Sequence, residues 1–85
     1  MIYISEAHPD NSTVILHVEG DLDAEYLPVL VDIYRKNLGS RKAIKISLEK
    51  ISVVDRAGKA FLRDVQDKVQ YIGMPLHIQI EIGVG

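Results

Sequence analysis

The charged pair Asp55-Arg56 stands where an apolar segment, residues 51–54, gives way to the small residues Ala57 and Gly58. An aspartate directly before a helix caps free backbone N–H groups, so Asp55 is expected to cap a helix, alone or together with a partner contact. The arginine places positive charge where the helix dipole is already positive, which costs roughly 0.3–1 kcal/mol. Arg56 therefore needs a nearby acid or an anionic partner.

Two interpretations of Arg56 remain open at the sequence level. With Lys59, one turn later, it could form a small anion-binding corner at the helix start. Alternatively, Asp55, Asp21 or Glu49 neutralises it on a solvated surface.

Other residue types that could do chemistry give weaker patterns. Asp21, Asp23 and Asp55 are all expected beyond the carboxyl ends of parallel strands, where a receiver-like aspartate phosphoacceptor would hold magnesium. The chain is too short for the five βα units of that fold, and it lacks a later strand with the required hydroxyl and lysine. No serine with a general base, glycine-rich phosphate loop or metal-ligand pair occurs at a recognisable spacing. We expect no enzyme activity and no cofactor.

Composition narrows the class of protein further. The 85 residues are expected to form one domain, 1–85, with a small core. Ten basic and twelve acidic residues are scattered along the chain, which argues against a nucleic-acid partner. The chain has no cysteine, and no apolar run approaches the roughly 20 residues of a spanning helix. We expect a cytoplasmic protein without direct membrane insertion.

The first half predicts a hairpin followed by a helix. Residues 1–5 and 13–19 read as strands joined by turn residues 8–12, and Gly20 is expected to end the second strand. Asp23 is a plausible N-cap of a helix that ends at Gly39. Because Pro28 is too deep for an ideal first position, either a tight turn spans residues 24–27 or the regular helix starts only near Pro28.

The second half repeats the strand-then-helix pattern. Residues 43–49 alternate in polarity and predict a strand with one buried face, residues 56–72 predict a helix, and residues 75–82 alternate again and predict the last strand. The predicted fold is α/β in the order ββαβαβ: a four-stranded mixed sheet with two main helices on one face. His17 and His77 are expected on the open face, and His8 in a turn, as exposed polar residues.

Three pieces of this pattern resemble the STAS domain family. They are the turn Gly20-Asp21-Leu22-Asp23, the Ile-Ser-x-Val-Asp segment of residues 51–55 that runs into a small-residue helix start, and the break Gly73-Met74-Pro75. The resemblance implies a short STAS-like fold and a function like that of bacterial anti-sigma-factor antagonists, which dock through the loop and helix after the third strand. The partner-binding residues that it implies here are Asp21, Asp23, Val54, Asp55, Arg56, Ala57, Gly58 and Lys59.

The chain departs from the family at the regulatory position. That helix usually opens Asp-Ser-x-Gly, with a serine that the partner kinase phosphorylates, whereas here Arg56 and Ala57 follow Asp55. Arginine neither accepts phosphate there nor imitates phosphoserine, whose charge is opposite. The resemblance then implies a constitutive binder, or one regulated through its partner. Ser52 is a weaker candidate for phosphorylation, because it more simply ties down the turn.

The resemblance also implies the kind of partner. The first choice is an anti-sigma-factor kinase or a related transcription regulator, and the alternative is an ABC-type lipid transporter whose subunits the chain would join. Many STAS domains continue into a further helix, whereas this chain is expected to stop after its last strand. Apolar surface near that strand would then be closed by a homodimer contact or by a partner.

Overall fold

The computed structural model describes residues 1–83 and has four strands and three helices. In chain order they are β1 (Ile2–Asp10), β2 (Thr13–Leu22), α1 (Leu27–Leu38), β3 (Ala43–Val54), α2 (Arg56–Asp64), β4 (Val69–Ile72) and α3 (Leu76–Ile82). The predicted order ββαβαβ is confirmed, and a further helix follows it.

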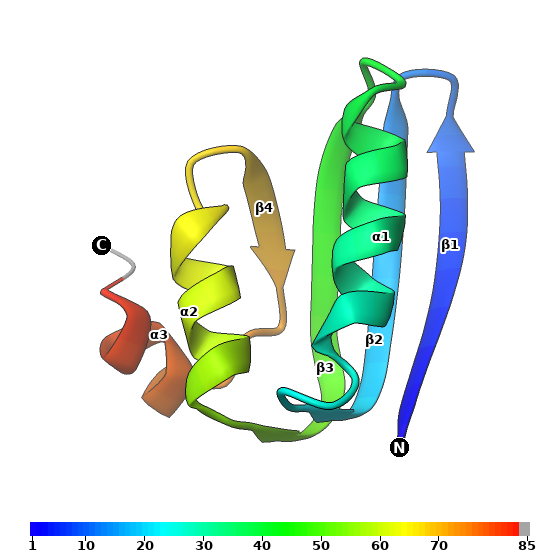
Figure 1. Cartoon of the computed structure of the whole chain (residues 1–85). Helices are drawn as coiled ribbons and strands as arrows, with labels where there is room; N and C mark the ends of the chain where they lie inside the picture. Colours follow the sequence, from blue (N-terminus) through cyan, green and yellow to red (C-terminus); the bar gives the residue numbers. More distant parts are fainter. Residues whose placement is uncertain (84–85) are drawn as a thin grey trace.

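The strands form one mixed sheet in the order β1-β2-β3-β4 (Figure 1). β1 pairs antiparallel with β2, while β2 with β3 and β3 with β4 are parallel. α1 and α2 are the two crossovers between parallel strands and lie on the same face of the sheet, as the right-handed rule for such connections requires. Within residues 1–83, no helix combines the length and the apolar character that crossing a bilayer demands.

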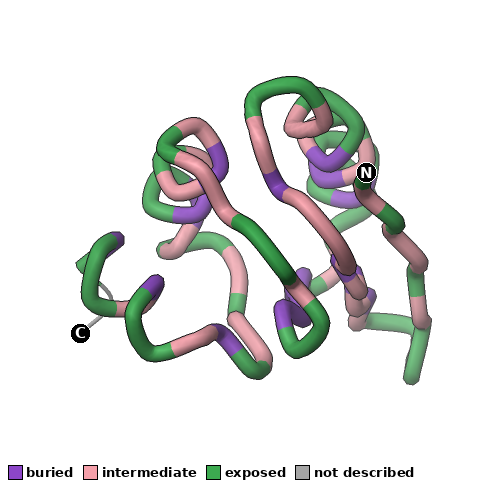
Figure 2. Tube along the Cα trace, turned by 90° about the horizontal axis from the view of Figure 1, so that it is seen from below, coloured by how far each residue is buried: buried purple, intermediate pink, exposed green. Residues whose placement is uncertain are grey.

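The core lies mainly between the sheet and these two helices, and α3 adds Ile78 and Ile82 to it. Alternate residues of β2 and most residues of β3 that face the helices are buried, and α1 and α2 also carry buried residues (Figure 2). Side chains that are fully shielded from solvent include Leu16, Leu22, Leu30, Ile46, Leu48 and Leu62. The prediction of one buried and one open sheet face is confirmed.

Both central strands run further than the sequence indicated. β2 continues through Gly20 to Leu22, and Leu22 is still paired with Val54 of β3. Gly20 has φ +90° and its added Cβ would lie 2.4 Å from the Met1 carbonyl oxygen, so it marks an irregularity inside the strand. The expected strand end at Gly20 is therefore wrong.

The predicted helix over residues 56–72 is also wrong in its second half. α2 ends at Asp64, and residues 69–72 form β4, paired in parallel with residues 44–47 of β3. The β-branched and aromatic side chains of Val69, Tyr71 and Ile72 suit a strand, and here pairing with β3 outweighs the helical stripe that continues into them.

The predicted last strand, residues 75–82, is instead the helix α3. Ile78 and Ile82, four residues apart, are each 2% exposed, whereas Leu76 and Ile80 are 69% and 70% exposed. The four apolar residues, at every second position, thus lie on two different faces of the helix. Over so short a segment, the same spacing also fits a strand with one apolar face. His77 consequently lies on α3 and not on the open sheet face, and the expectation that no further helix follows the last strand is wrong.

Candidate functional site

The carboxyl ends of β2 and β3 meet at the start of α2. Leu22 and Val54 are the last paired residues, and the Asp55 backbone N–H donates to the Leu22 carbonyl oxygen at 3.1 Å. Asp55 then takes an extended conformation (φ −84°, ψ −173°), and its Oδ1 accepts from the Gly58 N–H at 2.9 Å. The predicted helix cap is confirmed.

The second carboxylate oxygen of Asp55 reaches the other loop. Oδ2 accepts from the backbone N–H of Ala24 at 3.0 Å, so one side chain joins the start of α2 to the segment between β2 and α1. The Gly58 N–H first, and then the Ala24 N–H, lower the pKa of Asp55 because they favour its charged form. The carboxylate is thus committed to holding the two loops together.

Gly58 lets these segments approach closely. A Cβ at this position would lie 2.5 Å from the Leu22 carbonyl oxygen and 2.9 Å from Cγ1 of Val54. Only glycine allows the first turn of α2 to pack against the end of β2 at this distance. Gly58 is buried, and it positions its neighbours.

The other two acids of the predicted cluster also bind donors within the chain. Asp23 Oδ1 accepts from the Tyr26 N–H at 3.0 Å, and its carbonyl oxygen accepts from the Leu27 N–H at 2.7 Å. Residues 24–26 form a turn and α1 begins at Leu27, so the expected tight turn and the expected helix start near Pro28 are both present. The N-cap of α1 is Tyr26, so the expected N-cap role of Asp23 is wrong, and Asp23 closes the preceding turn instead. Asp21 Oδ2 lies 3.0 Å from the Met1 amino group. Within residues 1–83, no group of three or more acidic, histidine or cysteine side chains is placed to hold a metal.

Arg56, the first residue of α2, is exposed. Across the described residues 1–83, no carboxylate oxygen lies within 4.0 Å of its guanidinium group, so neither Asp55, Asp21 nor Glu49 forms an ion pair with it. The unfavourable placement at the helix start is therefore not compensated by an intramolecular contact.

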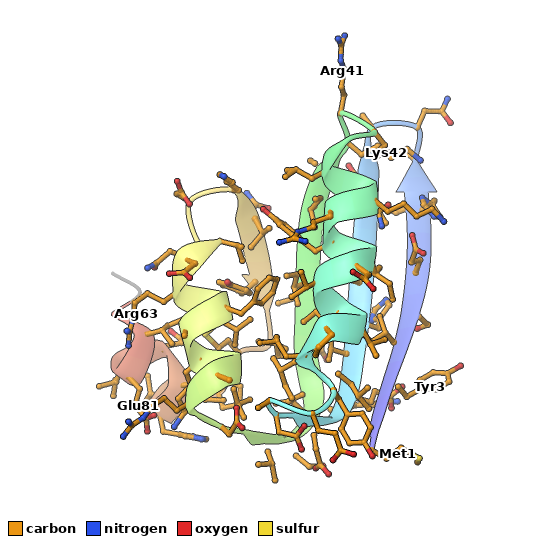
Figure 3. The ribbon with its side chains drawn as sticks, viewed as in Figure 1. Met1, Tyr3, Arg41, Lys42, Arg63 and Glu81 are labelled. Carbon is orange, nitrogen blue, oxygen red and sulfur yellow. The ribbon has the colours of Figure 1, made fainter. Side chains whose placement is uncertain are left out.

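Lys59 and Arg63 continue the positive charge along the same face of α2. Lys59 Nζ forms an ion pair with Glu81 of α3, and this contact lowers the pKa of Glu81. Arg63 Nη2 donates to the Glu81 carbonyl oxygen at 3.0 Å; Figure 3 labels both residues. With Arg56 and Ala60 these residues line a hollow of about 420 Å³. The spacing of residues 56, 59 and 63 indicates that they share one helix face. The contact with Glu81 was not predicted, because residues 75–82 were expected to form a strand.

The remaining predicted residues surround this helix start. Val54 and Ala57 are half-buried, and neither carries a hydroxyl. Ser52 is exposed within β3 and lies in no turn, so the expectation that it ties one down is wrong.

Comparisons with known proteins give the fold a name. SpoIIAA, an anti-sigma-factor antagonist in its unphosphorylated form, superposes with a TM-score of 0.77 and 13% identity over 98% of this chain and 84% of its own. An anti-sigma-factor antagonist from Mycobacterium paratuberculosis gives 0.72 and 16% over 84% of this chain, which spans 64% of that protein. Mglu gives 0.65 and 17%, with 85% of this chain matching 19% of Mglu.

The fold is therefore STAS-like, as the sequence motifs predicted. No protein-family model matches the chain, and neither does any curated protein sequence. Since one fold supports many functions, the function has to be argued from the surface itself.

Proposed function

We propose that this chain is a STAS-type protein-interaction module that binds a partner protein at the start of α2. The α2 tip, as we call this surface, presents Asp21, Asp23, Val54, Arg56, Ala57 and Lys59, with Asp55 and Gly58 holding it from below. The observation that carries the proposal is the exposed Arg56, which sits at the positive end of a helix without an acidic contact in residues 1–83. An acidic group on a partner would compensate this charge.

The α2 tip is built to present Arg56 without rearrangement. Asp55 bonds to both loops, and Gly58 packs its helix turn directly on the Leu22 carbonyl group. A surface fixed in its bound geometry loses less entropy on association, which favours recognition of a partner.

Binding, and not catalysis, is the activity that we infer. Asp55, Asp23 and Asp21 each bind a donor within the chain, so the acids nearest the surface serve its architecture. Because Arg56 and Ala57 carry no hydroxyl, we infer that the module is not switched by phosphorylation at the usual position, and that it binds constitutively or is regulated through its partner.

The partner that we propose is a bacterial regulator of the anti-sigma-factor kinase class. Support comes from the STAS-like motifs of the sequence and from the two anti-sigma-factor antagonists that share the fold. Because Arg56 is positively charged, we infer that the partner presents an acidic group at the centre of the contact.

The test compares Arg56→Glu with a matched reversal, Arg41→Glu, at the opposite end of the molecule (Figure 3). The partner is captured from a lysate of the source organism with the unaltered chain and identified, and its affinity for each variant is then measured. Arg56→Glu is expected to weaken binding at least about tenfold, since truncated charge contacts at interfaces reach this size, while Arg41→Glu binds as before. If both variants bind the partner as tightly as the unaltered chain, and neither unfolds at a lower temperature, the α2 tip is excluded as the docking surface.

A further inference from the structure

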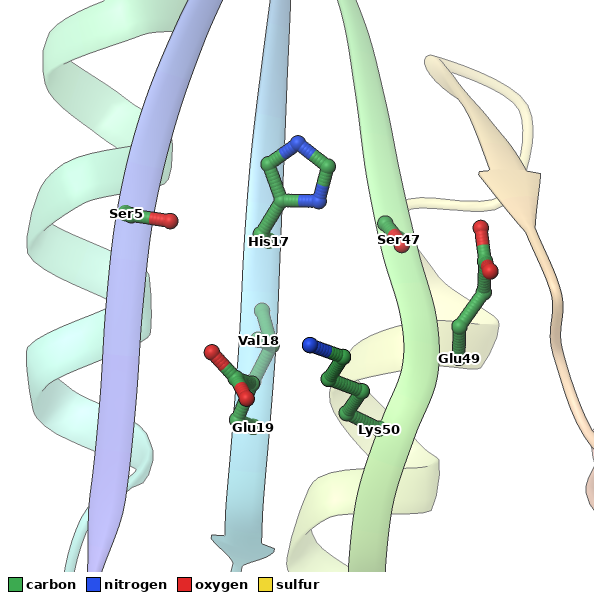
Figure 4. Close-up of a pocket in the computed structure, with 7 residues that line it drawn as sticks. All are labelled: Ser5, His17, Val18, Glu19, Ser47, Glu49 and Lys50. Carbon is green, nitrogen blue, oxygen red and sulfur yellow. The ribbon is translucent and has the colours of Figure 1, made fainter.

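The open face of the sheet, opposite α1 and α2, carries a polar hollow of about 330 Å³ (Figure 4). Its polar lining residues are Ser5, His17, Glu19, Ser47, Glu49 and Lys50. Three strands contribute to it, and none of these residues belongs to the α2 tip.

Ser47 gives this hollow a buried polar wall. The residue is only 4% exposed, and its hydroxyl has no hydrogen-bond partner anywhere in residues 1–83. The Ser47 oxygen still reaches solvent in the hollow, because the Tyr34 hydroxyl is the fully buried unpaired side-chain atom of residues 1–83. A ligand atom in the hollow would supply that partner.

The strand register places two more polar groups beside Ser47. His17 pairs with Ser47 on one side and with Ser5 on the other, so the three side chains form one row across β1, β2 and β3. Neighbouring strands lie about 4.7–4.9 Å apart, and the row is therefore about 10 Å wide. The imidazole can donate or accept, according to its tautomer.

An irregularity in β3 brings charge to the same place. His17 pairs with Ser47, but Glu19 pairs with Lys50, so β3 holds one extra residue between the two pairs. Leu48 remains fully buried, while Glu49 and Lys50 are both exposed and both line the hollow. Bulges of this kind change the direction of side chains, and here the bulge places Glu49 and Lys50 on the same face of the sheet.

The charges of the lining select the class of ligand. With neutral His17, the two glutamates and Lys50 leave the hollow with an excess of one negative charge, which disfavours a simple anion. A simple cation would leave the donors of Ser47 and Lys50 without an acceptor. A molecule with both signs satisfies both sets, because an ammonium group can bind Glu49 while a carboxylate accepts from Lys50 and Ser47.

We propose that this hollow is a binding site for a small zwitterion of the amino-acid type. The site goes beyond the proposed docking function and uses a separate surface. Ser47, Lys50 and His17 orient the carboxylate of the ligand, and Glu49, which lies on the other side of Lys50 from Glu19 (Figure 4), holds its ammonium group.

The experiment titrates the ¹⁵N-labelled chain with each common amino acid in turn and follows the backbone amide signals. Acetate and methylammonium, each alone, serve as probes that carry only one of the two charges. At least one amino acid is expected to shift the amides of residues 17–19 and 47–50 in a saturable way, with a Kd of about 1 mM, and to bind at least about tenfold more tightly than either single-charge probe.

Variants assign the binding to the hollow. Ser47→Ala and Glu49→Gln are each expected to weaken it about tenfold. Lys50→Gln should do the same, whereas Lys45→Gln, on the same strand but outside the lining, should leave it unchanged. Arg56→Glu should also leave it unchanged, which separates this proposal from the docking function.

Three outcomes would overturn the proposal. They are the absence of saturable shifts with any amino acid up to about 20 mM, equal affinity for acetate or methylammonium, and shifts that persist in both Ser47→Ala and Glu49→Gln. Because the Ser47 hydroxyl has no partner in residues 1–83, Ser47→Ala should fold normally, and a thermal unfolding curve verifies this.

Discussion

The start of α2 and the helix α3 are attached to the molecule in opposite ways. At the start of α2, the contacts involve the backbone: Asp55 bonds to two N–H groups, and Gly58 lies directly on a carbonyl group of β2. α3 is held by the side chains of Ile78 and Ile82 in the core, by the ion pair of Glu81 with Lys59, and by the Arg63 guanidinium group, which donates to the Glu81 carbonyl oxygen. A surface that depends on backbone contacts tolerates few changes beneath it, whereas one held by side chains depends on a small number of them.

This difference assigns different roles to the two regions. In the proposed function the α2 tip, held by backbone contacts, presents the charge of Arg56, while α3 shields the side of α2 and leaves Leu76 and Ile80 exposed. Elements with few buried apolar contacts open at lower free energy than the centre of a fold. We therefore expect α3 to open more readily than the junction at Asp55.

The largest expected effect comes from the buried face of α3. Ile78→Ala should lower the free energy of unfolding by about 2–4 kcal/mol, because Ile78 is almost fully buried and its loss leaves a cavity. Ile80→Ala, two residues away but 70% exposed, should change it by less than about 0.5 kcal/mol. Urea unfolding of both variants measures the contrast. Equal losses would show that α3 does not present these faces in solution.

The next effect tests the close approach at the start of α2. Gly58→Ala adds a carbon 2.5 Å from the Leu22 carbonyl oxygen, and the strain should lower stability by about 1–3 kcal/mol despite the better helix propensity of alanine. Gly39→Ala is the control, since its Cβ would meet nothing nearer than 3.8 Å and its φ is −70°. That variant should be neutral or slightly stabilised. A stable Gly58→Ala protein would mean that α2 sits further from β2.

These two regions also differ in how well the sequence predicted them. β2, β3 and the start of α2 were predicted because their apolar alternation is long and the cap signal of Asp55 is local. β4 has four residues and α3 has seven, and over such lengths the alternation of apolar residues fits a strand and a helix equally well. The choice between strand and helix is made by tertiary structure: residues 69–72 pair in parallel with β3 and are therefore a strand.

In the candidate site, too, the sequence predicted local contacts and missed contacts between distant residues. The cap by Asp55 follows from adjacent residues, but its bond to Ala24 joins positions 31 apart and has no local signal. The pairing of Glu81 with Lys59 and the bulge that turns Glu49 toward the open face depend on tertiary structure in the same way. Sequence patterns therefore located the start of α2 and its cap, but not the contacts that join it to the rest of the chain, and not the hollow of the open face.

The smallest effect tests whether Asp55 uses both oxygens. Asp55→Asn keeps one acceptor, so it can still cap α2 at Gly58 but can no longer bond to Ala24 as well. At pH 7 the variant should unfold at a lower urea concentration than the unaltered chain. Asp10→Asn, whose wild-type carboxylate bonds only within the β1–β2 turn, is the control, and it should leave the amide signal of Ala24 unchanged.

The pH dependence of that difference has a definite sign. The pKa of Asp55 is lowered in the folded chain by the Gly58 and Ala24 N–H groups, while in the unfolded chain it returns to about 3.9. A lowered pKa stabilises the fold above the unfolded value, and this contribution disappears as the pH falls through the folded value. The gap in urea midpoint between the unaltered chain and Asp55→Asn should therefore be constant from pH 7 to about pH 5, and it should narrow below about pH 4. A gap that stays the same down to pH 2 would mean that the ionised carboxylate does not hold the two loops together.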